Sequence, residues 1–348
     1  MVRLKDIAER AGVSVMTVSK ALRDEPDVSA VTKARIKLLA QEMGYVPDTT
    51  AQGLRTRTTK VFGLLIPSTT DPIYARVVLA IEERAQELGY DLMLTHTLNS
   101  TEREEHCIRR LLSRRVDGLF VAPVYRMSPE ARIYQELLTR KIPVVLLGPP
   151  ARFCSPFTAM QVDDLLGSYA ATKHLLTLGH RHIAYFAGPL AAPWAQERFE
   201  GYRRALREAG SDVDDRLIFQ AGSTIEDGVK AALQLLNEGV QVTAIQTAND
   251  LVAIGCADAL LNQGIRIPQS LSVVGFGNIL ASEYFRVPLT TVRQPKFRMG
   301  VAAMESMMQL IRGQRGESKR LPAELVIRAS TAAPQMNPLQ ADLGTAAA

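Results

Sequence analysis

The chain has 348 residues, a length that at ~150 residues per domain indicates two or three domains. Hydrophobic residues make up 47% and charged residues 22%, ordinary globular values that exclude a chain disordered throughout. No apolar run approaches the ~20 residues of a membrane span, and the first residues lack the apolar core of a secretory signal. The three cysteines are scattered, which favours a reducing cytoplasm over a disulfide framework.

The net charge of +5 is concentrated near the N-terminus. Residues 1–60 contain eleven Lys and Arg against seven Asp and Glu and so carry +4, whereas the other 288 residues carry +1. A small basic module on a nearly neutral body indicates a head that binds a polyanion and a body with another task. A solvated basic face without a partner would give the same asymmetry, so charge alone leaves both interpretations open.

Three short helices are predicted in the first 45 residues. The first ends at Gly12 and the third at Gly44, and Ser14 can cap the second, which runs from Val15 to about Leu22. The first two helices and the turn between them are typical of a helix-turn-helix. Helical spacing marks the following residues as the inward faces: Leu4, Ile7, Ala8, Ala11, Val18, Leu22, Ile36, Leu39, Ala40 and Met43.

The outer face of the second helix carries hydroxyls, one lysine and two apolar side chains. If this helix enters a major groove with its N-terminus first, Val15, Met16 and Lys20 meet base edges. Lys20 can donate to guanine, whereas Val15 and Met16 can read only shape. The hydroxyls within reach of phosphate oxygens are then those of Ser14, Thr17 and Ser19. A three-helix bundle with a hydroxyl-rich surface and no partner is the alternative.

A linker follows, in which Asp48 can cap a helix that reaches about Leu54. Seven or eight residues that include Gly53 fall below the ~12–15 at which isolated helices become even marginal. We therefore expect this segment to be disordered in the free protein and helical when two copies pack together on DNA. A flexible tether is the alternative.

From Val61 onward, buried strands alternate with amphipathic helices, and the rhythm restarts after Val162. Strands are expected at 61–66, 90–95, 117–121, 143–147, 182–186, 216–220, 243–246 and 271–275. Helices are expected at 77–88, 102–112, 129–139, 164–178, 195–209, 225–236 and 250–262. This α/β repetition predicts two lobes of parallel sheet, each covered on both faces, with a ligand crevice at the carboxyl ends of the strands.

The head closely resembles that of LacI/GalR-family transcriptional regulators. The matching segments are LKDIAERAGVS at 4–14, TVS at 17–19, VS at 28–29, GYVP at 44–47 and AQGLR at 51–55. The resemblance makes residues 15–22 the recognition helix, with base contacts by Val15, Met16 and Lys20. It makes the linker a hinge helix, with Ala51 and Leu54 among the DNA contacts and Leu54 wedged into a minor-groove step. It implies backbone contacts by Ser14, Thr17, Ser19, Ser29, Thr32 and Tyr45.

The body resembles the same family and its periplasmic sugar-binding relatives, so a periplasmic-binding-protein-like core is implied. The matches are RRVDG at 114–118, LGHRHIA at 178–184, AGP at 187–189, RFEGY at 198–202, ND at 249–250 and LTTV at 289–292. The resemblance covers about residues 2–330 and implies three crossings between lobes, near 161–163, 290–293 and 320–323. The implied parts are a head (1–47), a hinge helix and linker (48–60), an N-terminal lobe (61–161 with 293–320), a C-terminal lobe (162–292 with 321–332) and a disordered tail (333–348).

The family commonly grips its effectors with an Arg on a helix of the second lobe, an Asn-Asp pair at a strand end and an acid after a Gly-aromatic pair. Arg198 and Asn249 fill the first two positions. Arg198 could instead pair on the surface with Glu197 or Glu200, and Asn249 could simply cap the helix that follows it.

The third position departs from the family, because Gly277 stands where sugar-responsive members usually have Asp. Ser223 stands where some members place a stacking aromatic ring, while Trp194 could stack on a ligand ring or pack in the core. Phe297, which is similarly ambiguous, and Tyr74 complete the candidate effector site. These departures favour a more charged or more apolar ligand than an unmodified hexose.

The sequence therefore predicts a sequence-specific DNA-binding transcriptional regulator, a repressor of a metabolic operon. It is expected to act in the cytoplasm as a homodimer on near-palindromic double-stranded DNA, under a small-molecule effector such as a sugar derivative. Control by a protein partner and a carrier without a regulatory role are the alternatives. An enzyme is disfavoured because P-loop, GxSxG and HExxH motifs are absent and Gly275-x-Gly277 lacks the third glycine of a dinucleotide fingerprint, and no cofactor is expected. No metal is expected, because His180 and His182 have no nearby third ligand.

Overall fold

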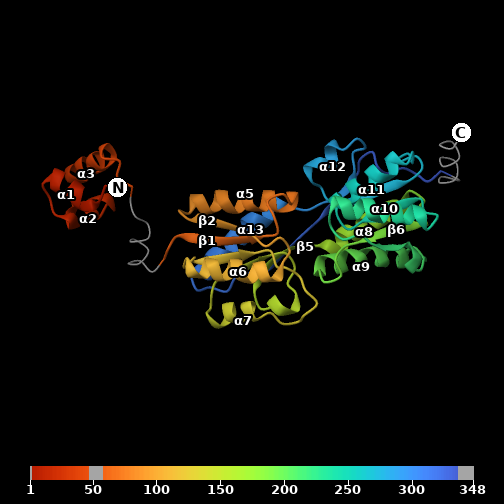
Figure 1. The fold of residues 1–348 in the computed structure, drawn as a ribbon, viewed down its shortest axis with the longest axis horizontal. Coiled ribbons are helices and arrows are strands. Elements are labelled where there is room, and N and C mark those ends of the chain that lie inside the picture. Colours follow the sequence, from red (N-terminus) through yellow and green to blue (C-terminus); the bar gives the residue numbers. More distant parts are fainter. Residues whose placement is uncertain (1, 47–57, 336–348) are drawn as a thin grey trace. The chain divides into compact units, whose positions relative to one another are not determined.

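The computed structural model describes residues 2–46 and 58–335 and divides into two compact units, the head up to Thr59 and the core from Lys60 (Figure 1). The predictions for the hinge helix, with Ala51 and Leu54, and for residues 336–348 of the tail lie outside the described residues.

The head consists of α1 (Leu4–Ala11), α2 (Val15–Leu22) and α3 (Ala30–Glu42). Its centre is formed by Ile7, Val18 and Ile36, one residue from each helix, and all three are completely buried. Gly12 adopts φ +64° between α1 and α2, a conformation that suits glycine. The predicted helix-turn-helix is therefore present.

The core contains two six-stranded sheets with helices on both faces of each. Sheet A has the order β11-β5-β4-β3-β1-β2 and is entirely parallel. Its strands are β1 (Val61–Ile66), β2 (Asp91–His96), β3 (Gly118–Val121), β4 (Val144–Leu147), β5 (Thr158–Val162) and β11 (Lys319–Leu321). Its helices are α5 (Pro72–Glu87), α6 (Thr101–Ser113), α7 (Arg132–Thr139) and α13 (Lys296–Ile311).

Sheet B has the order β12-β10-β9-β8-β6-β7 and is parallel except for β12, which runs antiparallel to β10. Its strands are β6 (Ile183–Ala187), β7 (Ile218–Gln220), β8 (Ala244–Thr247), β9 (Ser272–Gly277), β10 (Thr290–Arg293) and β12 (Glu324–Val326). Its helices are α8 (Asp164–Thr177), α9 (Pro193–Glu208), α10 (Ile225–Asn237), α11 (Asp250–Asn262) and α12 (Leu280–Tyr284).

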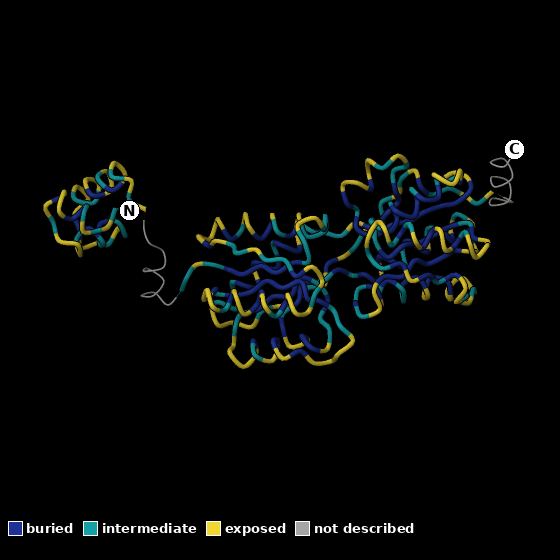
Figure 2. The backbone as a smooth tube through the Cα atoms, viewed as in Figure 1, coloured by how far each residue is buried: buried dark blue, intermediate teal, exposed yellow. Residues whose placement is uncertain are grey.

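The central strands of each sheet are buried along most of their length because both faces of each sheet are covered (Figure 2). In β1, Phe62, Leu64 and Ile66 pack under α5 and α13, whereas Leu65 packs on the opposite side with α6 and α7. Figure 1 shows α5 and α6 on these two faces of sheet A. In sheet B, α10 and α11 cover one face and α8 and α9 the other.

Several elements begin at other residues than the sequence predicts. Helix α5 starts at Pro72 and not at Val77, because the carboxylate of Asp71 accepts the N–H of Ile73 at 3.0 Å and proline suits the first helical position. Strand β7 starts at Ile218, since residues 215–217 form a 3₁₀ turn. Among the described residues, no helix is long and apolar enough to cross a membrane.

Candidate functional site: a DNA-reading face and an interlobe pocket

The start of α2 exposes the residues that the sequence assigns to DNA bases. The hydroxyl of Ser14 accepts the N–H of Thr17 at 3.0 Å and so caps the helix. Val15 and Met16 are 45% and 63% exposed, so two apolar side chains project from this end without a partner in the head. A helix that enters a major groove with its N-terminus first would bring these two side chains to base edges.

Lys20, Ser29 and Thr32 already have partners within the head. The ammonium of Lys20 forms a salt bridge with Asp27, and this bond lowers the pKa of the Asp27 carboxyl. Because the pair is exposed, exchanging it for a guanine acceptor costs little. Ser29 caps α3 through the N–H of Thr32 at 3.2 Å. Among the others, Thr17 and Ser19 are half-buried, as is Tyr45, which packs against the core of the head.

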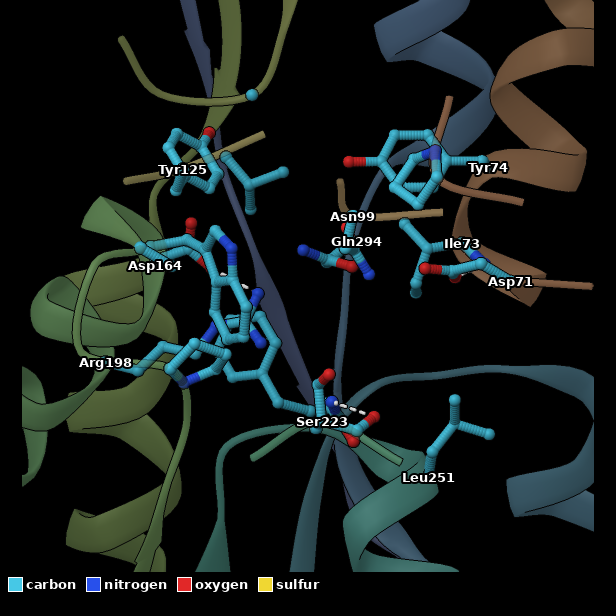
Figure 3. A pocket seen from close by; sticks show the side chains of 18 of the residues that line it. Asp71, Ile73, Tyr74, Asn99, Tyr125, Asp164, Arg198, Ser223, Leu251 and Gln294 are labelled. Atoms are coloured by element: carbon cyan, nitrogen blue, oxygen red, sulfur yellow. Dashed lines mark hydrogen bonds and ion pairs between the residues drawn. The ribbon is translucent and has the colours of Figure 1, made fainter. Parts of the chain in front are cut away.

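A pocket of about 540 Å³ lies between the two lobes of the core, at the carboxyl ends of the strands. From the N-terminal lobe it is lined by Asp71, Ile73, Tyr74, Asn99 and Tyr125 among others, and from the C-terminal lobe by Asp164, Trp194, Arg198, Ser223, Asn249 and Phe276 among others. Figure 3 shows Arg198 and Asp164 on one side of the pocket and Tyr74 and Asp71 on the other. A ligand held here would therefore touch both lobes.

Arg198 is only 6% exposed and is held by several groups of its own lobe. Its guanidinium lies between the rings of Trp194, at 4.6 Å, and Phe276, at 3.6 Å. Nε donates to one oxygen of Asp164 at 2.7 Å, Nη2 lies 2.7 Å from the same oxygen in the ion pair, and Nη1 donates to the carbonyl of Ala248. Burial raises the pKa of Asp164 to about 6, although the charge of Arg198 opposes this shift.

The surface alternative for Arg198 is wrong, because both acids proposed for it are paired elsewhere. Glu197 bonds Arg320 at 2.7 Å, and Glu200 pairs with arginines further along α9. Arg198 reaches Asp164 because α8 and α9 pack closely at Gly201, where a Cβ would meet the carbonyl oxygen of Leu165 at 2.3 Å.

Asn249 does cap α11, since its Oδ1 accepts the N–H of Val252 at 2.8 Å. Its Nδ2 donates to the carbonyl of Ser223 at 3.0 Å, and both residues line the pocket. Asn249 can therefore cap α11 and line the pocket at the same time, because the hydrogen bond of the cap fixes its side chain at the pocket wall. Trp194 also lines the pocket and is half-buried, so part of its ring is open to a ligand.

Two predicted effector residues, Gly277 and Phe297, are not among those that line the pocket. Gly277 has φ +138°, and a Cβ there would come within 3.1 Å of Cδ1 of Ile73. An aspartate at this position would therefore be strained and crowded. Phe297 is 41% exposed on the first turn of α13. Tyr74 does line the pocket, and burial raises the pKa of its hydroxyl.

Three residues that line this pocket, Asp164, Phe276 and Asp250, were not among the effector-binding residues predicted from the sequence. Asp250 is buried and accepts bonds from the Thr291 hydroxyl at 2.5 Å and the Ile279 N–H at 2.9 Å, and burial raises its pKa. Asp164 and Asp250 each begin a predicted helix. The start of a helix that follows a strand lies at the edge of a parallel sheet where ligands bind, so these two positions could have indicated the site.

Two family models match the chain. One, described as periplasmic binding proteins and sugar binding domain of LacI family, matches residues 59–329, and the other, described as bacterial regulatory proteins, lacI family, matches residues 3–48. The chain is 33% identical to the HTH-type transcriptional regulator DegA of Bacillus subtilis, over 94% of this chain and 97% of that protein. It is 34% identical to the HTH-type transcriptional repressor PurR of Photobacterium profundum, over 95% and 98%.

The fold is similar to that of the lac repressor dimer bound to operator and the anti-inducer ONPF. The TM-score is 0.85 at 29% identity, and the likeness covers 95% of this chain and 99% of that chain. Head and core thus match one family along almost the whole length, in sequence and in structure. The chain belongs to the LacI family of DNA-binding bacterial transcriptional regulators, whose members are regulators and not enzymes.

Proposed function

We propose that the protein represses a metabolic operon as a cytoplasmic homodimer, without enzymatic activity, and that a small molecule in the interlobe pocket sets its affinity for a near-palindromic operator. The observation that carries this proposal is the pocket, because it is lined by both lobes and contains a buried arginine fixed between two rings. A ligand that bridges two lobes favours their closed arrangement and can transmit binding energy to the DNA-binding end.

On DNA, the exposed start of α2 is the reading surface. Val15 and Met16 would contact thymine methyl groups, while Lys20 would leave Asp27 to bind guanine. The hydroxyls of Ser14, Thr17, Ser19, Ser29 and Thr32, together with Tyr45, would hold the phosphate backbone. Two heads related by the two-fold axis of a dimer would read two half-sites.

Coupling between pocket and DNA would pass through residues 48–56. These residues are too few for a stable isolated helix, so their helix would form only when two copies pack on DNA with Ala51 and Leu54 at the minor groove. An effector that changes the distance between the two linkers of the dimer would favour or oppose this folding.

The effector is a compact ring compound with at least one acceptor oxygen. Two of the five N–H groups of Arg198 donate hydrogen bonds to protein acceptors, so up to three remain for a ligand. Trp194 offers a ring for stacking. Gly277, which lies outside the pocket lining, supplies no carboxylate, and Ser223 supplies no aromatic ring to grip a plain hexose. A more charged or more apolar metabolite fits this wall better.

Two experiments test the proposal. Selection of bound duplexes from random sequence should enrich a near-palindrome, and a lack of enrichment would refute the repressor. A thermal-shift screen of metabolites, read against the variant Trp194→Ala, should identify a ligand whose stabilisation the variant loses. If a neutral monosaccharide proved the best ligand, the inference from Gly277 and Ser223 would be wrong. If only a protein from cell extract altered DNA binding, control by a protein partner would replace the small molecule.

A further inference from the structure

The edge of sheet A that lies opposite the pocket has a marked excess of basic over acidic residues. All strands of sheet A are parallel, so they start at one edge, and the helices between them return to that edge. We define this basic edge as residues 58–60, 88–91, 113–117, 139–143, 156–158 and 311–319. It contains three acidic residues, Asp91, Asp117 and Glu317. It contains eight basic residues: Lys60, Arg114, Arg115, Arg140, Lys141, Arg312, Arg315 and Lys319.

The charge of this edge is unusual for the core as a whole. The 288 residues after Lys60 carry only +1 in total. Because the basic edge alone is more positive than that, the remainder of the core is net negative. The core therefore has one basic end and a nearly neutral or acidic remainder, which gives it a preferred orientation toward a polyanion.

Four of these cations are available to a partner. Arg114, Lys141, Arg312 and Arg315 are exposed, and no ion pair joins them to any residue in the described ranges 2–46 and 58–335. They extend from three different helices, since Arg114 follows α6, Lys141 follows α7, and Arg312 and Arg315 follow α13. Other basic side chains of the edge are already engaged: Arg140 with Glu136 at 2.8 Å, Lys319 with Glu305 at 3.0 Å, and Lys60 over the ring of Tyr90 at 4.2 Å.

The chain enters the core at this same edge. Lys60 directly precedes β1, which begins at the end of sheet A that points away from sheet B (Figure 1). Only residues 47–57 separate the described part of the head from the described part of the core, and eleven residues span at most ~40 Å when fully extended. The head is therefore tethered to the core at the same edge that carries these cations.

We propose that the basic edge of the core binds phosphates of the duplex that the head holds. This inference rests on the proposed operator binding and adds a second, sequence-independent contact surface to it. Lysine and arginine neutralise phosphates with little regard to base sequence, and each such contact releases counterions. The partner is the DNA backbone, because an acidic protein would have no reason to prefer the edge at which the DNA-binding head is attached.

Cations at helix ends also have a local role that needs no partner, because they interact favourably with the last carbonyl groups of a helix. Arg114 and Arg312 occupy such positions at the ends of α6 and α13. Arg315 lies beyond the end of α13, so its charge is not explained by that helix end. Phosphate binding and stabilisation of a helix end can be distinguished by measuring DNA affinity as a function of salt concentration, because only phosphate binding contributes to the salt dependence.

The test compares two full-length variants that each lose four positive charges. One carries R114Q, K141Q, R312Q and R315Q at the basic edge, and the matched control carries R132Q, R152Q, K173Q and K230Q, exposed residues elsewhere on the core. Affinity for a duplex of arbitrary sequence is measured between about 50 and 200 mM KCl. The logarithmic salt slope should fall by ~0.9 for each lost phosphate contact in the edge variant and stay unchanged in the control.

An unchanged slope in the edge variant would overturn the inference, and so would an equal loss in the control, because the effect would then follow net charge alone. If the unmodified protein failed to bind any duplex, the proposed function itself would fall. Should the fourfold variant not fold, R315Q alone leaves every helix end intact. It should lower the slope by ~0.9 per subunit without changing the thermal midpoint, and an unaltered slope would again refute the contact.

Discussion

Arg198→Ala is the substitution whose effect follows most directly from the structure. It removes a guanidinium that bonds Asp164 at 2.7 Å and lies between the rings of Trp194 and Phe276. The side chains of Arg198 and Asp164 are 7% and 3% exposed, so both charges are almost fully withdrawn from water in the intact protein. The variant leaves a buried carboxylate without its cation.

Breaking a buried ion pair by removing one partner costs ~3–5 kcal/mol of folding stability. The cost should depend on pH, because Asp164 has a pKa of about 6 with Arg198 present and Arg198 acts to lower it. Without Arg198 the pKa rises further, so the folded variant keeps its proton at pH 5. A carboxyl whose pKa is raised on folding is stabilising at low pH and loses that stability as the pH rises through the folded-state pKa. The variant is thus weakest in alkaline solution.

Urea unfolding at pH 5 and pH 8 measures this difference. The fluorescence of Trp194, the single tryptophan, reports unfolding of this lobe, and circular dichroism provides an independent signal. The double variant R198A/D164A removes both charges and should be more stable at pH 8 than R198A. A cost below about 1 kcal/mol at pH 8, or an equal cost at both pH values, would refute the assignment of a buried pair.

Three further predictions concern two DNA-contact residues and Gly277, the position that departs from the family pattern. Lys20→Ala should relax base preference in selected duplexes by ~1–3 kcal/mol at one position while leaving binding to random duplex nearly unchanged; a uniform loss would assign Lys20 to phosphate. Leu54→Ala should weaken operator binding more than random-duplex binding, measured by fluorescence anisotropy, and equal losses would contradict a wedge. Gly277→Asp should lower folding stability by ~1–3 kcal/mol, because an aspartate at φ +138° has a strained backbone and its Cβ crowds Ile73. The double variant G277D/I73A shortens the neighbouring side chain and should recover part of this stability; no recovery would show that crowding is not the cause.

The head and the alternating part of the core could be predicted from sequence because their signals are local. Gly12 and Ser14 mark the turn of the helix-turn-helix, and both act there as expected. Helix α11 begins and ends at the predicted residues, since Asn249 caps it. Strands β5, β10, β11 and β12 were not predicted. With three residues each, β11 and β12 are too short to show a periodicity and exist only through their neighbours β5 and β10.

The pocket was predicted in its position but not in its internal bonds. The partnership between Arg198 and Asp164 joins residues 34 positions apart and depends on the close packing of α8 and α9 at Gly201. No sequence period encodes that contact. The surface partners suggested for Arg198 were its near neighbours in α9, the only acids that local spacing can offer, and tertiary packing supplied a different one.

The basic edge could not be recognised from total charge. Its cations lie in segments far apart along the chain, such as residues 113–117 and 311–319, and only the parallel sheet brings them to one edge. The +5 of the whole chain divides between the head and this edge, with a net negative remainder. Two basic surfaces at the DNA-binding end of the chain would share the electrostatic part of operator affinity.

The most direct test of the regulator is operator affinity with and without a ligand of the interlobe pocket. The operator comes from duplex selection, and the ligand is the metabolite whose thermal stabilisation depends on Trp194. A coupling of 1–3 kcal/mol, typical between linked sites, predicts a change of ~5- to 150-fold in operator affinity, and by reciprocity the same factor in ligand affinity when operator is added. An operator affinity that stays the same while the pocket is saturated would contradict control of DNA binding from this site.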